Sequence, residues 1–423
     1  MVQSLYGTGY FGIFALLPRK IMNDGFDRSL PMRVQMPVYG VALFSNSIPD
    51  LVLVVMGLWL VQLETPLFMI GLLAGLRYVG PLLFAIHGGA MMDRIGTRRV
   101  LTFVALAMLI LPFVYPVAPW IPAIMALQLF CGMADSMGWV GAQTLTGQVL
   151  RGNPTYTGRL VFATRIGTFA GPPIAGAAWD IFGPWGGFAS LSLWGAGLLY
   201  SVVALPTDAL SEPTERRQSI VKAVTPRLVD YIEAFKLFAL PLMALVLAMT
   251  IIRQFGSGMQ SAFYAVYLDG IGMQGWLIGI LVSANGLTGI AALGSGALVK
   301  RFKEFSVLVW CIIISIASIA IVPLFTDFIP LFVASSLRGA VMAISVVIIV
   351  SLIARTVGPT VQGRAMGLRT TCNQAANVTI PIVMGGLAHF LGLELAFYLV
   401  GALGIALTLI TAFLARRVET PPV

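Results

Sequence analysis

Long apolar runs dominate this sequence and decide what it can fold into. Stretches of roughly 20 residues with few charges follow one another from Val38 to Ala415. Hydrophobic residues make up 58% of the chain and charged residues only 10%, whereas a soluble domain carries about 25% charged residues. A soluble surface so poor in charge would aggregate, so most of this surface must face lipid. The sequence therefore predicts a membrane protein built from spanning helices.

The apolar runs divide into two sets of six predicted spans. The first set is Val38–Val61, Leu67–Met91, Val100–Val117, Ile121–Ala142, Leu160–Ile181 and Gly187–Leu205. The second set is Leu240–Leu268, Trp276–Val299, Ser306–Phe325, Ile329–Ile353, Met366–Phe390 and Leu395–Ala415. We expect a lead-in or interfacial segment at residues 1–36, an N-terminal half at 37–205, a polar linker at 206–237, a C-terminal half at 238–415 and a tail at 416–423.

The distribution of basic residues predicts the orientation of these spans. Lys and Arg occur before span 1, in the linker, and after spans 2, 4, 8, 10 and 12, whereas the intervening connections contain no Lys or Arg. Cytoplasmic loops carry an excess of basic residues. Both termini are therefore expected in the cytoplasm, and we expect the inner membrane of a bacterium. The net charge of +9 belongs to these short loops, so it does not indicate a nucleic-acid partner.

The two halves repeat one another, as parallel-repeat transporters do. Gly158-Arg159 opens span 5 and Gly363-Arg364 opens span 11. In the same two spans, glycines and prolines recur with identical spacing, namely Pro172, Gly176 and Gly183 in one and Pro381, Gly385 and Gly392 in the other. The repetition predicts two six-helix pseudo-repeats.

The segment after span 2, residues 89–99, reads Gly-Ala-Met-Met-Asp-Arg-Ile-Gly-Thr-Arg-Arg. It resembles the loop between helices 2 and 3 of the major facilitator superfamily, and the matching positions are Gly89, Asp93, Arg94, Gly96, Arg98 and Arg99. Thr97 stands where a basic residue is common in the family. The resemblance covers essentially the whole chain and implies an all-α fold of twelve transmembrane helices that works as a monomer. It also implies that this loop is a conformational latch.

A second resemblance lies in span 5. Gly167, Gly171, Pro172 and Gly176 are similar to the Gly-Pro-rich motif of exporters in this family. Small residues permit close helix contact and proline bends a helix, so a kinked packing helix of any transporter is the alternative. Span 4 departs from the antiporter pattern, because Gln128 stands where the family's arginine precedes Gly132 by four residues. A proton role that depends on that arginine is therefore not expected here.

Ionisable residues inside the spans are the candidate functional groups, since a charge at mid-bilayer is costly unless it is paired or faces a cavity. They are Asp50, Arg77, Asp135, Arg165, Arg253 and Arg338. In the family resembled, helices 1, 4, 7 and 10 line the central cavity, and four of the six charges fall one to each. We expect Asp50 or Asp135 to carry the coupling proton, because a buried carboxylate exchanges protons as its surroundings change. The candidate substrate contacts are the four arginines and the amides Asn46, Gln254, Asn373 and Asn377. For Arg77 and Arg165, a salt bridge to one of the aspartates is the alternative.

The excess of arginine favours an anionic or zwitterionic solute. We expect proton-driven efflux of a small organic anion, zwitterion or amphiphile, with proton-linked uptake of an anionic metabolite as the alternative. A membrane enzyme or sensor is a remote third possibility, because no paired catalytic dyad, HExxH motif or phosphate-binding loop is found. No cofactor and no metal site are expected.

Overall fold

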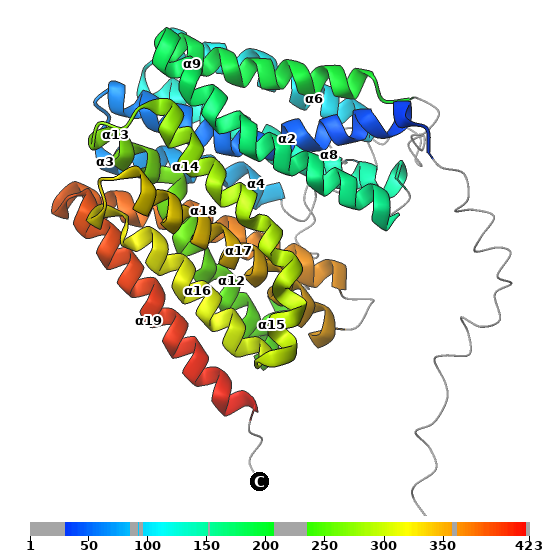
Figure 1. Ribbon diagram of the computed structural model, residues 1–423, viewed down its shortest axis with the longest axis vertical. Helices are drawn as coiled ribbons and strands as arrows, with labels where there is room; N and C mark the ends of the chain where they lie inside the picture. The colour runs from blue at the N-terminus through cyan, green and yellow to red at the C-terminus, as the bar shows by residue number, and fades with distance from the viewer. Residues whose placement is uncertain are drawn as a thin grey trace, which may run out of the picture.

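The computed structural model describes residues 30–84, 92, 96–150, 153–206, 235–357 and 362–419 of the chain. All regular structure within these ranges is helical (Figure 1). Residues 1–29 of the expected lead-in or interfacial segment and residues 207–234 of the linker lie outside the described residues.

The N-terminal helices run from Met32 to Val203. Span 1 is α2 (Met32–Gln62), span 2 consists of α3 (Leu67–Leu76) and α4 (Val79–Phe84), and span 3 of α6 (Thr97–Ile110), η1 (Leu111–Phe113) and α7 (Val114–Val117). Span 4 is α8 (Ile121–Gln148), and spans 5 and 6 are the two arms of α9 (Pro154–Val203). The arms meet at Gly183, whose φ of 64° and ψ of −151° only glycine adopts readily.

The C-terminal helices follow the same order. Span 7 consists of α12 (Pro241–Met259), the π-helix η4 (Gln260–Tyr264) and α13 (Ala265–Gly270), after a short η3 (Lys236–Ala239). Span 8 consists of α14 (Gly275–Leu287), η5 (Thr288–Gly294) and α15 (Ser295–Arg301). Span 9 is α16 (Glu304–Ala320) with η6 (Val322–Leu324), and spans 10 to 12 are α17 (Phe328–Thr356), α18 (Gln362–Leu391) and α19 (Leu393–Glu419).

The described helices agree with the twelve predicted spans. Nine are long and apolar enough to cross a membrane, α9 counting as one of them, and the shorter apolar helices Gly275–Gly286 and Glu304–Ala320 supply two more. Span 2 differs from the expected uninterrupted run, because its helix is interrupted at Arg77 and Tyr78. Pro81 explains this interruption: it has no N–H to donate to the Arg77 carbonyl, and that carbonyl instead approaches Gly132 on α8.

The helices form two bundles that meet at one end. Contacts between the bundles are most extensive where α9 packs on α14 and α3 packs on α18, with further contacts of α13 on α2. We call the end that carries the turns at residues 63–66 and 271–274 the distal end, and the opposite end the linker end. In Figure 1 the bundles lie together near α3 and α13 and diverge toward α15, which lies at the linker end.

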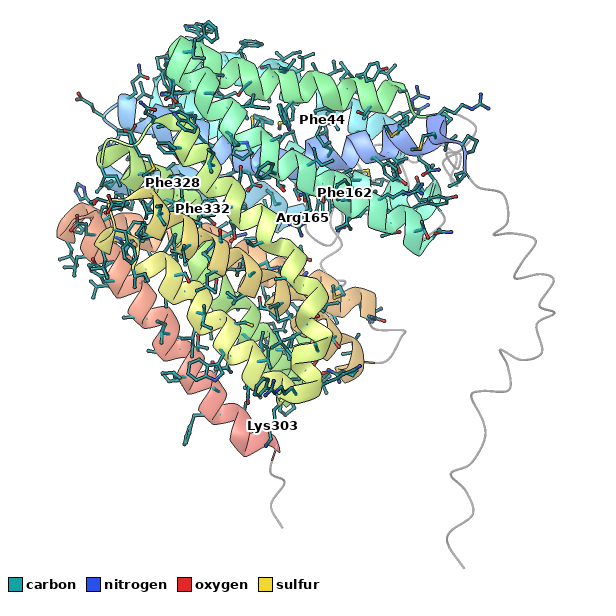
Figure 2. All side chains as sticks on the ribbon, viewed as in Figure 1. Phe44, Phe162, Arg165, Lys303, Phe328 and Phe332 are labelled. Atoms are coloured by element: carbon teal, nitrogen blue, oxygen red, sulfur yellow. The ribbon has the colours of Figure 1, made fainter. Side chains whose placement is uncertain are left out.

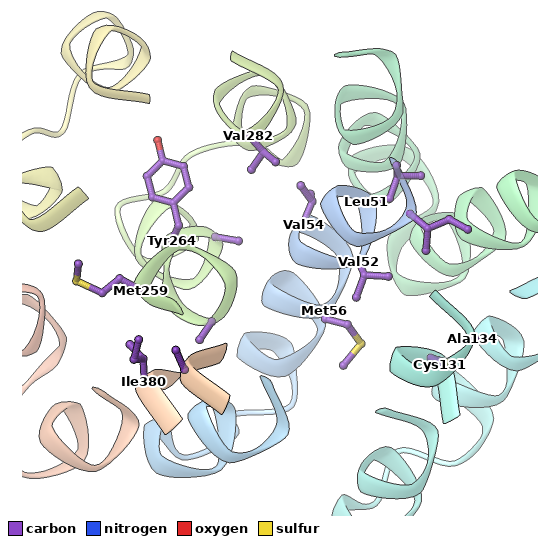
Figure 3. Close-up of a cluster of buried hydrophobic side chains, with 14 of the residues drawn as sticks. Leu51, Val52, Val54, Met56, Cys131, Ala134, Met259, Tyr264, Val282 and Ile380 are labelled. Atoms are coloured by element: carbon purple, nitrogen blue, oxygen red, sulfur yellow. The ribbon is translucent and has the colours of Figure 1, made fainter. Parts of the chain in front are cut away.

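Helix α2 forms the centre of the hydrophobic core. Leu51 and Val54 on α2 are fully buried, as are Met259 and Tyr264 on the C-terminal side. Figure 3 shows that α2 lies between α8 on one side and the helices of span 7 on the other. The core is therefore continuous across the two bundles at this level.

Glycines hold the bundles close together toward the distal end. A Cβ at Gly176 on α9 would lie 2.0 Å from the carbonyl oxygen of Gly275 on α14, and a Cβ at Gly71 on α3 would lie 2.2 Å from the carbonyl oxygen of Pro381 on α18. Backbone therefore packs directly on backbone at both places. Side chains larger than hydrogen at these positions would force the bundles apart.

Candidate functional site

A central cavity of about 220 Å³ lies between the two bundles. Its polar lining comes from both sides. The N-terminal bundle supplies Asp50, Arg77, Tyr78 and Gln128, and the C-terminal bundle supplies Ser257, Gln260, Ser261, Asn285 and Arg338. A cavity of this size admits a small organic solute rather than a macromolecule.

A second cavity of about 210 Å³ adjoins the first and shares Pro49, Arg77 and Tyr78 with it. Its other polar lining residues are Ser45, Asn46, Asp135, Ser136, Trp139 and Gln374. Of the predicted site residues, Asn46 and Asp135 therefore face this second space and Asp50 and Arg338 face the first. The Arg77 side chain lies at the boundary between them.

Arg77 and Asp135 form a buried ion pair. Arg77 Nη2 donates to Asp135 Oδ2, and both side chains are 8% exposed. Arg77 Nη1 also donates to Gln128 Oε1 at 3.2 Å, and the Tyr115 hydroxyl donates to the same oxygen at 3.1 Å. Gln128, which occupies the family's arginine position on span 4, thus contacts an arginine that comes from span 2. The salt bridge was one of the two alternatives expected for Arg77.

Arg338 is anchored at the π-helix of span 7. Its Nη1 donates to Gln260 Oε1, and Asn285 Nδ2 donates to the same oxygen at 3.4 Å. The π-helix changes the local register of the side chains, as such segments often do at functional sites, and Gln260 is its first residue. Arg338 is 2% exposed and its Nε has no hydrogen-bond partner within the described part of the chain.

Asp50 has no hydrogen bond and no ion pair among the described residues, although its carboxylate borders the central cavity. The cationic groups near enough to act on it electrostatically are Arg165 and Arg338. Arg165 lies between the bundles (Figure 2) and donates from Nη1 to the Gly286 carbonyl oxygen at 3.1 Å. A salt bridge between Arg165 and an aspartate, which was the alternative to substrate contact for this residue, is not formed among the described residues.

The remaining predicted contacts lie together on α12 and α18. Gln254 Nε2 donates to Asn377 Oδ1 at 2.8 Å, and Asn377 Nδ2 donates to Gln374 Oε1 at 3.2 Å, which connects this group to the second cavity. Arg253 is 7% exposed and donates from Nη1 to the Met342 sulfur at 3.5 Å. Asn373 Oδ1 is buried without a partner among the described residues.

Only part of the predicted latch falls within the described residues. Gly89, Asp93 and Arg94 lie outside them. Gly96 has a φ of 96° directly before α6, a backbone conformation that favours glycine. Arg98 Nη2 donates to the Val203 carbonyl oxygen at 2.9 Å, and Arg99 is exposed.

The glycines of the span 5 motif face two different helices. Gly167 and Gly171 pack on Leu43 and Leu51 of α2, whereas Gly176 packs on Gly275 of α14. A Cβ at Gly279 of α14 would lie 2.4 Å from the Pro172 carbonyl oxygen. The motif therefore joins α9 both to its own bundle and to the opposite one.

Sequence reasoning missed Gln260 of the central cavity, Arg369 on α18, and Asp180, which accepts hydrogen bonds from the first residues of α14 in the opposite bundle. Arg369 on α18 is half-buried, and its Nε is buried without a partner among the described residues; it was overlooked because it lies only a turn or two inside the helix. Gln260 was missed because nothing in the sequence marks a π-helix. Asp180 was missed because it stands at the end of its span, and its role depends on a contact with the other bundle.

Comparison with known proteins places the chain within one family. The sequence profile of the Major Facilitator Superfamily matches residues 2–305 and 246–423, which together span nearly the whole chain. No curated protein matches the sequence significantly. Two crystal structures of the nucleoside transporter NupG are similar in fold. A mutant of NupG has a TM-score of 0.73 at 14% identity, covering 90% of this chain and 99% of that one. A second NupG structure has a TM-score of 0.71 at 14% identity, covering 90% and 98%.

Proposed function

The chain belongs to the major facilitator superfamily, and on that premise we propose that it is a proton-coupled exporter of a small organic anion, zwitterion or amphiphile. The family and the fold make it a membrane transporter rather than an enzyme. The observation that carries the proposal is that Asp50 and Arg338 border one cavity from opposite bundles. Relative movement of the bundles changes the surroundings of both charges at once, as alternating access about a central site requires.

Asp50 is proposed as the proton carrier. Its carboxylate borders the central cavity without a hydrogen-bond partner among the described residues, so a proton or a solute can reach it. Asp135 is engaged by Arg77 within a single bundle. A proton would have to compete with this hydrogen-bonded guanidinium for the carboxylate, which makes Asp135 the less suitable carrier. This choice narrows the sequence-based expectation, which left both aspartates open.

Arg338 is proposed to bind the anionic group of the solute. A guanidinium offers five donors in a planar fork that fits carboxylate or phosphate oxygens, and Arg338 uses one of them on Gln260. Gln260, Asn285 and the serines of span 7 supply further hydrogen bonds around the same space. Asn46 and Gln374 offer contacts in the adjoining cavity to a solute that extends into it.

The conformation described is proposed to face the cytoplasm. Basic connections lie at the linker end, and cytoplasmic loops are richer in Lys and Arg. Both termini are therefore proposed to be cytoplasmic, in the inner membrane of a bacterium. The bundles meet toward the opposite end, which would be the periplasmic one. We propose that the two moving halves are residues 37–205 and 238–415. The latch between them is proposed to be residues 89–99, and the protein is proposed to work as a monomer.

Proton-linked uptake of an anionic metabolite is the second candidate. The span 5 motif favours export, because its glycines form the contact between the bundles. Gln128 favours uptake, since the arginine associated with antiport on span 4 is replaced. The NupG structures are 14% identical to the chain, so they support the fold alone; their description as a nucleoside transporter is a reason to include a nucleoside among the test solutes.

The experiment uses everted membrane vesicles with an imposed proton gradient. Labelled benzoate, a zwitterionic amino acid, a lipophilic cation and uridine are compared for the native protein and for Asp50→Asn. Gradient-driven accumulation of the anion or zwitterion that Asp50→Asn abolishes supports the proposal. Loss of solute from preloaded vesicles along with protons favours uptake, and gradient-driven movement of the cation or of uridine alone contradicts the proposed substrate class.

A further inference from the structure

Three arginines of the C-terminal bundle form no ion pair among the described residues, and of these only Arg338 has an aspartate, Asp50, across the central cavity. Arg253 on α12, Arg338 on α17 and Arg369 on α18 lie inside the membrane-spanning helices, and none of these helices contains an Asp or a Glu. The ion pairs of the described residues, Arg77 with Asp135 and Arg355 with Glu304, involve other groups. Buried guanidinium groups without a counterion are costly, which indicates that an anion is present in some state of the protein.

The hydrogen bonds around Arg253 and Arg369 are also incomplete. Arg253 has a weak bond to a methionine sulfur, and its Nε has no partner. The buried Nε of Arg369 has none either. A guanidinium has five N–H donors, and leaving them unpaired inside a protein is unfavourable. An ion with several acceptor oxygens would satisfy both side chains.

The arrangement of the helices brings Arg253 and Arg369 to the same interface, between α12 and α18. Arg369, Asn373 and Asn377 are spaced by four residues and so share a face of α18. Asn377 accepts a hydrogen bond from Gln254 of α12, so that face lies against α12 next to Arg253. Arg369 and Arg338 are the charged groups near enough to Arg253 to act on it electrostatically. All three carry the same charge, so an anion among them would offset their repulsion.

The three arginines differ in depth. Arg369 is seven residues from the start of α18, Arg253 is twelve from the start of α12, and Arg338 is eighteen from the end of α17, all measured from the linker end. At 1.5 Å per residue, these positions are about 10, 18 and 27 Å from that end. They form a series that leads from the linker end to the central cavity.

We propose that Arg253 and Arg369 form a second anion site, which binds carboxylate or phosphate oxygens on the linker side of the central cavity. A solute approaching from the linker end would meet Arg369 and Arg253 before Arg338. That a transported solute meets this second anion site before Arg338 rests on the proposed function. Binding of an anion by Arg253 and Arg369 does not depend on it. The same oxygens could belong to a soluble anion or to the head group of an anionic lipid, and the test separates these sources.

The test measures thermal unfolding of the purified full-length protein in uncharged detergent. Sodium phosphate is titrated against sodium chloride at matched ionic strength. A ligand that binds the folded state raises the unfolding temperature by an amount that grows with its concentration relative to its dissociation constant. We expect phosphate to raise it for the native protein, and Arg253→Gln and Arg369→Gln each to weaken the apparent phosphate affinity at least roughly tenfold, since each removes one of two charged contacts.

Arg355→Gln is the matched control, because Arg355 lies at the linker end of α17 and already has a carboxylate partner in Glu304. It should leave the phosphate response unchanged. Arg253→Lys keeps the charge without the planar fork and should retain part of the response. Without phosphate, Arg253→Gln should unfold at a higher temperature than the native protein, since it removes an uncompensated charge. A phosphate response equal in the native protein and both Gln variants, or no phosphate-specific response, would overturn the proposal.

A parallel measurement in lipid nanodiscs identifies the source of the oxygens. If phosphate still stabilises the native protein in nanodiscs of phosphatidylglycerol as it does in phosphatidylcholine, the site takes a soluble anion. If phosphatidylglycerol removes the phosphate response, and Arg369→Gln loses the stabilisation that this lipid gives, a lipid head group occupies the site. Neither measurement involves a proton gradient or transport. The anion site can therefore be confirmed or excluded even if the transport experiment contradicts the proposed function.

Discussion

The Asp180 carboxylate of the N-terminal bundle accepts a hydrogen bond from the Gly275 backbone N–H of the C-terminal bundle, at 2.8 Å. Its other oxygen accepts from the N–H of Trp276 at 2.9 Å. Gly275 and Trp276 are the first residues of α14. A helix N-terminus has unpaired N–H groups and a partial positive charge, both of which favour a carboxylate. Asp180 therefore caps a helix of the opposite bundle, and this contact must break whenever the distal end opens.

Replacing Asp180 by Asn should shift the protein toward conformations that are open at the distal end. The amide keeps one acceptor oxygen and loses the charge, so about 1 kcal/mol of the cap is lost, which is roughly fivefold in the ratio of open to closed forms. The measurement is the distance distribution between spin labels at Gln62 and Glu394, which are both exposed at the distal end. In Asp180→Asn a larger fraction of molecules should show the long label-to-label distance of the open form.

Asp327→Asn is the control for that change. Asp327 also precedes a helix at the distal end, but its side chain forms no capping hydrogen bond with that helix. The distance distribution should stay as it is in the unsubstituted labelled protein. An equal shift in both variants would mean that surface charge, and not the cap of α14, controls the opening.

Gly176→Ala should prevent close contact of α9 with α14. The new Cβ would lie 2.0 Å from the Gly275 carbonyl oxygen, and both atoms are held by backbone. Overpacking of this kind costs about 1–3 kcal/mol, so the closed distal end should be depopulated and the rate of transport should fall at least roughly fivefold. Gly386→Ala, which meets nothing within 4 Å, should transport at the native rate. If Gly176→Ala transports normally, the close contact is not needed for the cycle.

Asp135→Asn should strongly destabilise the fold. The change leaves Arg77 buried and without its carboxylate, and breaking a buried ion pair by removing one partner costs about 3–5 kcal/mol. The thermal midpoint in detergent should fall well below that of the native protein and of Asp50→Asn. The double variant Arg77→Gln/Asp135→Asn removes both charges and should recover much of the loss. Equal midpoints for the native protein and Asp135→Asn would show that the pair is not a structural element.

Arg338→Gln should weaken solute binding more than Arg338→Lys does. Loss of a charged, hydrogen-bonded contact costs about 2 kcal/mol or more, so the solute concentration for half-maximal transport should rise roughly thirtyfold or more. Lysine keeps the charge but cannot form the planar fork, which predicts a value between those of the native protein and Arg338→Gln. Concentration series in proteoliposomes give these values, and an unchanged half-maximal concentration in Arg338→Gln would exclude Arg338 from the binding site.

The fold could be predicted from the sequence because its main determinants are local. Apolar runs of spanning length and alternating basic connections require only a count along the chain, and the resemblance of residues 89–99 points to the family. The interruption of span 2 at Arg77 was less accessible, although Pro81 marks it in retrospect. The joining of spans 5 and 6 through Gly183 without a separate loop also exceeds what hydropathy indicates.

The sequence predicted which residues belong to the site better than it predicted which of them contact one another. The cost of burying a charge identified Asp50, Asp135 and Arg338 as candidates, and all three border the cavities. Which arginine pairs with which aspartate depends on the rotation of each helix about its axis, so Arg77–Asp135 was only one of several alternatives. The roles of Gln260 and Asp180 depend on a π-helix and on the packing of the two bundles, which no local pattern encodes.

The contact of Gly176 with Gly275 and of Gly71 with Pro381 has a thermodynamic consequence. Both contacts are formed by backbone atoms of helices that are already ordered. Closing such a surface immobilises no long side chain, so it avoids the rotamer entropy that a side-chain interface loses. Closing the distal end at these two contacts therefore loses little conformational entropy, so a modest packing energy is enough to hold it closed.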